Sequence, residues 1–299
     1  MHRAIAAWLT ERPWRAAVAS AVCGALSPQM LLPFAILAGA IPTLIALRFD
    51  PKTGLGVAAA GAVAAASVVL SVTAPTVWVF AAIGLLFVGP LALALLLRNT
   101  GSIVLCFQVA VLGAAVVLIG VHLALPDPMA VWADLLHKVM DSMAEAGIRL
   151  EGDQDEIVAV WARTMWGALA ALALAIVFGG LLLGQWWLSL LQSPGQFGAE
   201  YRKLRLGTAL GVTITLLFVL ALLTESSLIA SLAWVAFAAL AFQGLAAAHR
   251  SKAGGRLNRG SLAAIYVLLV VPLSTSITVF ILAVWGYADN WLRPRAQSA

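Results

Sequence analysis

Long stretches without a charged side chain divide this sequence. Seven runs contain no Asp, Glu, Lys or Arg: 16–47, 53–97, 99–126, 164–199, 206–224, 226–249 and 260–288. A helix rises about 1.5 Å per residue, so about 20 apolar residues cross a hydrocarbon core of about 30 Å. Each run can therefore span a membrane at least once. The pattern predicts an all-α fold, a polytopic transmembrane helical bundle.

Two of the runs are expected to hold a pair of helices. The run 53–97 is too long for one crossing, and the turn signal at 73–76 divides it into 55–73 and 76–97. The run 16–47 contains three prolines and has basic residues at both ends. If both ends face the cytoplasm, the chain crosses an even number of times. A hairpin of 14–27 and 31–47 that turns at 27–29 satisfies this, and a re-entrant pair is the alternative.

Basic residues give the orientation, because they are enriched in cytoplasmic loops. Nine spans with a cytoplasmic N-terminus and an external C-terminus place thirteen of the eighteen Lys and Arg residues in the cytoplasm. Arg293 and Arg295 are among the exceptions and argue against this count. Eight spans with both ends inside are the alternative. We expect one integral membrane domain over 1–299, with its N-terminal segment retained because no separate signal-peptide core precedes the first span.

Composition excludes a soluble protein. The chain is 63% hydrophobic and 10% charged, whereas soluble domains average roughly 45–50% apolar and about 25% charged residues. The net charge of +5 lies in short segments between spans, so we interpret it as a topology signal and expect no nucleic-acid partner. Cys23 and Cys106 lie in apolar runs and are expected to pack there. No cofactor or metal is predicted.

The segment 126–160 is the one sizeable extramembrane stretch. Apolar Trp132, Leu136 and Met140 recur at helical spacing, and acidic residues fall on the opposite face of the same helix. Asp127 is expected to cap this helix and Gly147 to end it. Because the polar face is acidic, attraction to anionic lipid is disfavoured. A lid or a docking face for a partner is the preferred interpretation, and passive packing at the membrane interface is the alternative.

Further along, the spacing of Asp153 and Glu156 predicts a helix cap in preference to a metal loop.

The segment 192–206 is predicted to be a cytoplasmic basic loop. It follows the aromatic sequence 185–187, of a type that favours the headgroup layer. Its candidate contacts with lipid or with a partner are Phe197, Tyr201, Arg202, Lys203 and Arg205.

Two parts of the sequence carry a family resemblance. The stretch QWWLSLLQSPGQFGAEYRKLRLG at 185–207 resembles the pattern "WWQ…L…NPGGF…EF…LRL" of the YybS-like family of bacterial inner-membrane proteins. The second match comprises 242–245, His249, Pro272, 285–291 and Arg293, which is similar to that family's ending "QGLA…H…P…G…D.W…R". The resemblance implies a multi-pass protein of the bacterial inner (plasma) membrane and transfers no catalytic residue.

A more remote similarity is to the S components of energy-coupling-factor vitamin transporters. In those proteins, small residues spaced four apart on the first helix contact a shared membrane coupling subunit. Ala17, Ala21 and Ala25 have that spacing here, and ordinary packing within the chain is the alternative. Gly180 and Gly184 form a second small-residue pair, for which internal packing is the default.

Motifs of intramembrane enzymes are missing from the sequence. It contains no HExxH, GxSxG, paired intramembrane aspartate or Walker A motif, so we expect no enzyme and no ATP hydrolysis by this chain. Uphill transport would then require a separate ATPase module or an ion gradient. Almost no ionisable residue lies inside the spans, which lowers the expectation of proton or sodium coupling.

Uncharged polar residues within the runs are the candidates for a ligand site. Gln108, Gln243, Ser274, Thr275 and Ser276 could line a site for a small neutral ligand near a helix broken at Pro272. The alternative is that the hydroxyls bond to their own helix.

Two functions therefore remain open. The first is a solute-binding transport subunit that relies on a separate energising module. The second is a non-transporting scaffold or assembly factor that presents the acidic helix and the basic loop to membrane partners.

Overall fold

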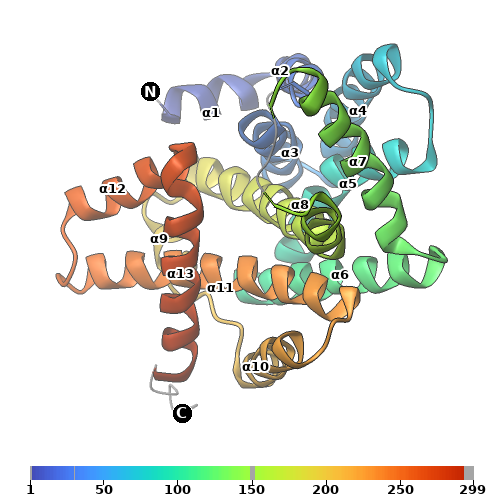
Figure 1. Ribbon diagram of the computed structural model, residues 1–299. Helices are drawn as coiled ribbons and strands as arrows, with labels where there is room; N and C mark the ends of the chain where they lie inside the picture. The colour runs from blue at the N-terminus through green and yellow to red at the C-terminus, as the bar shows by residue number, and fades with distance from the viewer. Residues whose placement is uncertain (1, 30, 149–151, 293–299) are drawn as a thin grey trace. The chain divides into compact units, whose positions relative to one another are not determined.

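The computed structural model describes residues 2–29, 31–148 and 152–292, and this part of the chain is helical with no strand (Figure 1). Its helices are α1 (His2–Glu11), α2 (Pro13–Leu26), α3 (Leu31–Arg48), α4 (Pro51–Val72), α5 (Val77–Thr100), α6 (Ile103–Ala124), α7 (Pro128–Glu145), α8 (Gln154–Gln192), α9 (Gln196–Tyr201), α10 (Thr208–Leu223), α11 (Ser227–Ala253), α12 (Arg259–Val270) and α13 (Pro272–Leu292). The predicted all-α class is confirmed for these residues.

Among the described residues, five helices are long and apolar enough to cross a membrane, namely α4, α5, α6, α8 and α11. Large hydrophobic side chains such as Val63, Phe80 and Val116 are exposed on them. Apolar side chains that water would surround are expected to face lipid instead. The chain is therefore an integral membrane protein. Three shorter apolar helices accompany the five, and the choice between nine and eight spans stays a prediction.

The predicted pairs of helices are present. α2 and α3 are separated by the expected turn near Ser27, whose hydroxyl donates to the carbonyl oxygen of Gly24 at 2.8 Å. α4 and α5 are separated at the expected turn, and the Thr76 side chain caps α5 by accepting a hydrogen bond from the backbone N–H of Val79. The α4 N-terminus is capped by Asp50, which accepts from the backbone N–H and the hydroxyl of Thr53. These hydrogen bonds lower the pKa of the Asp50 carboxyl.

The last charge-free run is broken into two helices, as its proline suggests. Proline lacks an N–H and disfavours helical geometry in the residue before it, so α12 ends at Val270 and α13 begins at Pro272. Figure 1 shows the chain bending sharply from the end of α12 into α13, and the two helices contact each other.

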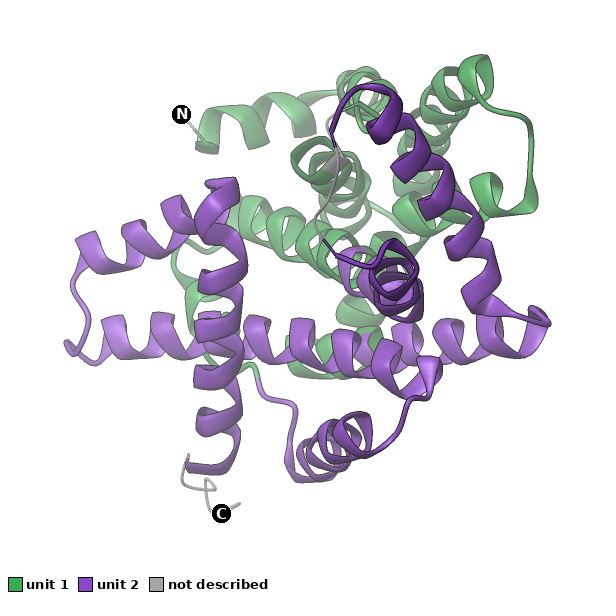
Figure 2. Cartoon of the chain, viewed as in Figure 1, with its two compact units in different colours: residues 1–110, 173–204 green, residues 111–172, 205–299 purple. Residues whose placement is uncertain are grey.

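The chain divides into two compact units, shown in different colours in Figure 2. Unit 1 comprises residues 1–110 and 173–204, and unit 2 comprises residues 111–172 and 205–299. The long helices α6 and α8 each contribute to both units. The expectation of one integral membrane domain over 1–299 stays a prediction.

Unit 1 is built on close contacts between small residues. α2 packs against α4, with Ser20 and Gly24 of α2 next to Gly61. Gly180 and Gly184 of α8 lie against α3, where Gly184 contacts Ala40 and Thr43. Backbones that approach closely gain van der Waals contact, which is a main source of helix association in lipid.

Unit 2 has its tightest contact where α11 crosses α13. A Cβ atom on Gly244 would overlap the carbonyl oxygen of Leu282, and one on Gly286 would overlap that of Leu240. Only glycine at both positions permits this crossing, which brings polar side chains of the two helices together.

Candidate functional site

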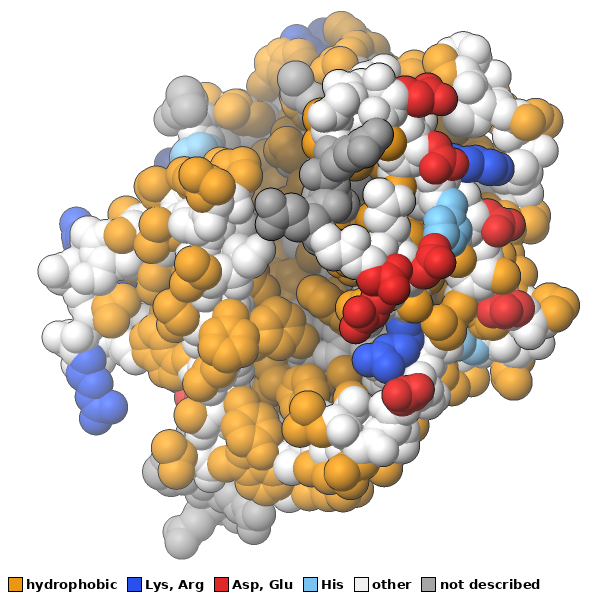
Figure 3. All heavy atoms as spheres, in the orientation of Figure 1, with side chains coloured by type: hydrophobic (Ala, Val, Ile, Leu, Met, Phe, Trp, Pro, Cys, Tyr) orange, Lys and Arg blue, Asp and Glu red, His pale blue; other side chains and the backbone are white. Residues whose placement is uncertain are grey.

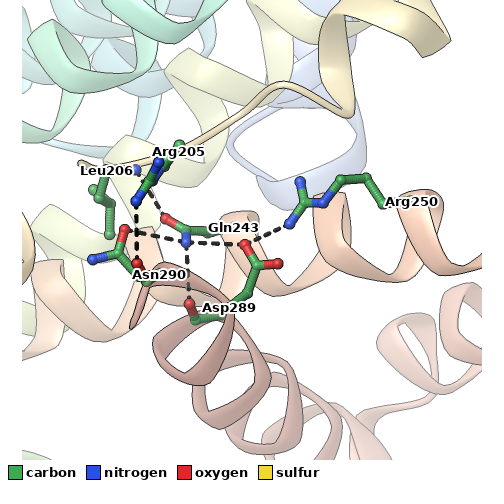
Figure 4. Close-up of polar contacts among 7 residues, drawn as sticks. Arg205, Leu206, Gln243, Arg250, Asp289 and Asn290 are labelled. Carbon is green, nitrogen blue, oxygen red and sulfur yellow. Dashed lines mark hydrogen bonds and ion pairs between the residues drawn. The ribbon is translucent and has the colours of Figure 1, made fainter. Parts of the chain in front are cut away.

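The polar side chains beside this crossing form the main candidate site, which we call the Gln243 cluster. It consists of Arg205, Leu206, Gln243, Arg250, Gly286, Asp289 and Asn290 (Figure 4). Three separate parts of the sequence supply it: the segment before α10, the second half of α11 and the last part of α13. All of them belong to unit 2.

Gln243 is the centre of the cluster, and its exposed fraction is 0%. Its Oε1 accepts a hydrogen bond from the backbone N–H of Leu206 at 2.9 Å. Its Nε2 faces the carbonyl oxygen of Gly286 at 3.1 Å and side-chain oxygens of Asp289 and Asn290, each at 3.3 Å. An amide nitrogen carries two hydrogens, so three acceptors share them. Both polar ends of this buried side chain are satisfied.

The remaining contacts tie the cluster to its surroundings. Asn290 donates from Nδ2 to the carbonyl oxygen of Gly207 at 3.2 Å, and its own carbonyl oxygen lies 3.5 Å from a terminal nitrogen of Arg205. Arg250 and Asp289 form an ion pair at 2.5 Å, with side chains 20% and 14% exposed. Arg250 lies in the last turn of α11, where a cation also interacts favourably with the helix dipole.

The cluster holds three segments of unit 2 together by hydrogen bonds, and we call this role a clamp. It joins the segment 205–207 to α11 and α13 through bonds that leave its buried amide groups paired. Satisfied polar networks fix one arrangement of the elements that carry them. A ligand could reach Gln243 only by displacing one of these protein partners.

The other predicted ligand-lining residues are not members of the Gln243 cluster. Ser274, Thr275 and Ser276 are at the opposite end of α13 from Asn290, and Gln108 belongs to unit 1. The hydroxyls of Ser274 and Thr275 donate to the carbonyl oxygens of Leu268 and Leu269 at 2.9 and 3.2 Å. These bonds run from α13 to carbonyls of α12 that the break at Pro272 leaves without an N–H partner. The role of these residues in a ligand site stays a prediction.

The small residues of α2 form two neighbouring stripes. The buried stripe is Ala16, Ser20 and Gly24, which faces the interior of unit 1. The predicted stripe, Ala17, Ala21 and Ala25, is only partly buried. Ala17 packs against the core of unit 1. Ala21 and Ala25 share the helix face of the exposed Trp14, Val18 and Val22.

The predicted basic loop is more structured than its composition indicates. It forms the short helix α9, where Tyr201 is buried and its ring stacks on Phe197 at 5.7 Å between centroids. Lys203 is exposed and pairs with Glu200 at 2.8 Å. Arg202 is partly exposed, and Arg205 belongs to the Gln243 cluster.

The predicted amphipathic helix is α7, which is capped by Asp127 as expected. Its Leu136 and Met140 pack against Val158 and Ala162 of α8. The indole N–H of Trp166 on α8 donates to the carbonyl oxygen of Pro128 at 2.9 Å.

The outer face of this pair of helices is acidic. Figure 3 shows acidic side chains gathered over α7 and the start of α8, and Asp134, Asp141, Glu145 and Glu156 are exposed. Asp153 accepts from the N–H of Asp155 at 2.9 Å, which is a capping contact. Among the described residues, no group of His, Cys, Asp and Glu could hold a metal ion.

Sequence reasoning marked Gln243 but missed its partners. Asp289 and Asn290 lie within the range 285–291 of the family pattern, and no local signal in the sequence predicts their contacts with Gln243 or the pair of Arg250 with Asp289. Arg293 and Arg295 lie outside the described residues.

Comparison of the chain with family models, with curated proteins and with solved structures finds no match.

Proposed function

We propose that this protein is a solute-binding membrane subunit that works with a separate energising module. The proposal includes the bacterial inner membrane as its location, a cytoplasmic N-terminus and no catalytic step. The observation that carries the proposal is the outer face of α2. Val18 and Val22 are each 53% exposed there, beside the partly buried Ala21 and Ala25.

This face is suited to a helix of a partner protein. The stripe that packs α2 against α4 is Ala16, Ser20 and Gly24, so the second small-residue stripe is not needed for that contact. Small residues spaced four apart allow another backbone to approach closely in lipid. This arrangement supports the similarity to S components, whose first helix contacts a coupling subunit through such a stripe.

We also propose membership of the YybS-like family. Three segments that carry the resemblance, 205–207, 242–245 and 285–291, meet in the Gln243 cluster or at its helix crossing. Segments that carry the family pattern therefore lie together in the structure, and this supports the proposed membership.

The partner contact can be tested by adding bulk to the outer face of α2. The double variant Ala21→Leu and Ala25→Leu should abolish co-purification of a membrane-bound ATPase from native membranes in mild detergent, measured by mass spectrometry. Ala17 is left unchanged because it packs inside unit 1. The matched control is the double variant Ala81→Leu and Ala82→Leu, which adds the same bulk at two exposed positions of α5. Full recovery of the ATPase with the double variant would refute the contact.

The scaffold remains a second candidate, favoured by the exposed acidic face of α7. Such a face fits a basic extracytoplasmic partner better than anionic lipid. Replacing Asp134, Asp141 and Glu145 by their amides should then remove an envelope protein from the co-purified set and leave membrane insertion unchanged. A co-purified set identical to that of the unmodified protein would exclude this role for α7.

A further inference from the structure

A cavity of about 270 Å³ lies in unit 1. Its apolar part includes the buried side chains of Leu97 and Ile103. Its polar part consists of Arg98, Gln185, Gln196 and Glu200, which are partly or fully exposed. The cavity therefore combines a hydrophobic floor with a rim that carries one positive charge, one negative charge and two amides.

Arg98 is anchored by two hydrogen bonds, and other N–H donors of its guanidinium are not used by them. One terminal nitrogen donates to the carbonyl oxygens of Ala46 and Phe49 at 2.9 and 3.0 Å, which anchors the guanidinium at the end of α3. A guanidinium has five N–H donors. Within the described part of the chain, the Nε and the second terminal nitrogen have no hydrogen-bond partner.

The other rim groups also have unused capacity. Oε1 of Glu200 accepts from the exposed Lys203, while Oε2 has no partner among the described residues. Neither the Gln185 amide nor the Gln196 amide bonds to another described side chain or backbone group. Four polar groups at one cavity thus offer both donors and acceptors to a ligand.

The position of the cavity in the chain gives its depth in the membrane. Arg98 ends the charge-free run 53–97 and lies in the last turn of α5. Basic residues at the end of an apolar span lie at the level of the lipid headgroups. The cavity is thus placed at the boundary between hydrocarbon and water, where an amphiphile can present a polar group to it.

We propose that this cavity binds an ammonium–phosphate zwitterion, the chemical group of phosphoethanolamine. The phosphate lies against Arg98 and the ammonium against Glu200, with the amides of Gln185 and Gln196 completing the hydrogen bonds. An anion alone would face the Glu200 carboxylate, and a cation alone would face the Arg98 guanidinium. The small volume fits a headgroup, since pockets for larger ligands are roughly 300–1,000 Å³.

The group can come from a phospholipid or from the free compound. This inference does not rest on the proposed function, because binding requires this chain alone and no ATPase.

The test uses the purified full chain in two assays. In the first, the protein is reconstituted in vesicles of equal parts phosphatidylethanolamine, phosphatidylcholine and phosphatidylglycerol, and the lipids retained after mild-detergent extraction are counted by native mass spectrometry. In the second, free phosphoethanolamine is titrated into the delipidated protein by calorimetry. We expect phosphatidylethanolamine to be retained over phosphatidylcholine by about tenfold, because a quaternary ammonium cannot donate hydrogen bonds to Glu200.

Two variants of the same ion pair sharpen the result. Glu200→Gln removes the carboxylate from the cavity and should lower retention by about tenfold. Lys203→Gln breaks the same pair but leaves the carboxylate in place, so it should retain the lipid as well as the unmodified protein does. If Glu200→Gln does not elute as a folded protein, Gln185→Leu replaces it and is expected to weaken binding as well.

The outcomes separate the two sources. Selective lipid retention that the variant loses supports a lipid headgroup, and calorimetric binding of phosphoethanolamine that the variant loses supports the free compound. Retained lipids that match the vesicle composition, together with no calorimetric signal, would overturn the proposal. Equal binding by Glu200→Gln and the unmodified protein would overturn it as well.

Discussion

Replacing Gln243 by leucine should destabilise unit 2 strongly. The two side chains are similar in size, so the change removes hydrogen bonds with little change in volume. It leaves the backbone N–H of Leu206 and the side-chain oxygen of Asn290 without their Gln243 partner, and both residues are buried. Removing one partner of a buried hydrogen bond costs roughly 1–3 kcal/mol. Two such bonds give an expected loss of about 4 kcal/mol in the free energy of unfolding.

The loss can be measured by thermal unfolding in mild detergent, followed by tryptophan fluorescence and by the fraction that remains monodisperse. A change of 1 kcal/mol moves the midpoint by roughly 2–4 °C in domains of about 150–250 residues. We therefore expect a fall of roughly 10 °C for Gln243→Leu. Gln192→Leu is the matched control, because Gln192 is exposed at the end of α8. A midpoint for Gln243→Leu equal to that of the control would refute the clamp.

Three further predictions concern other parts of the chain. Gly286→Ala should force α11 and α13 apart, because its Cβ would overlap the Leu240 carbonyl, and should lower the yield of monodisperse protein; Gly113→Ala, which meets open space, should not. Trp166→Phe should cost about 1 kcal/mol by losing one hydrogen bond, seen as faster amide exchange in α7. The pKa of Asp50 is lowered in the folded chain. The stability that its carboxylate contributes is therefore complete above the ordinary pKa of about 3.9 and is lost as the pH falls through the lowered pKa of the folded chain. Asp50→Asn should remove this acid-dependent part of the thermal midpoint.

Local signals in the sequence were sufficient to locate most helices. Prolines in polar turn sequences separated α2 from α3 and α4 from α5, and the spacing of Trp132, Leu136 and Met140 predicted α7 with its cap at Asp127. These features depend on residues a few positions apart. Helical periodicity and capping are therefore readable without knowledge of the tertiary contacts.

Contacts between distant segments were not readable in this way. α2 carries small residues on two adjacent stripes, so composition alone cannot tell whether Ala16, Ser20 and Gly24 or the stripe of Ala21 faces α4. The bonds of Gln243 join residues 37 to 47 positions apart. They depend on the crossing of α11 and α13, whose position is set by two glycines and not by a periodic pattern.

The fold at Pro272 bears on how the chain is threaded through the membrane. α12 has 12 residues, a length of about 18 Å, which is too short for a hydrocarbon core of about 30 Å. A helix that enters partway and returns through α13 would leave the C-terminus on the side from which α12 began. That side also holds the basic segment 250–259, which the enrichment of basic residues in cytoplasmic loops assigns to the cytoplasm. We therefore expect insertion to deliver both ends of the chain to one compartment, as in the eight-span alternative.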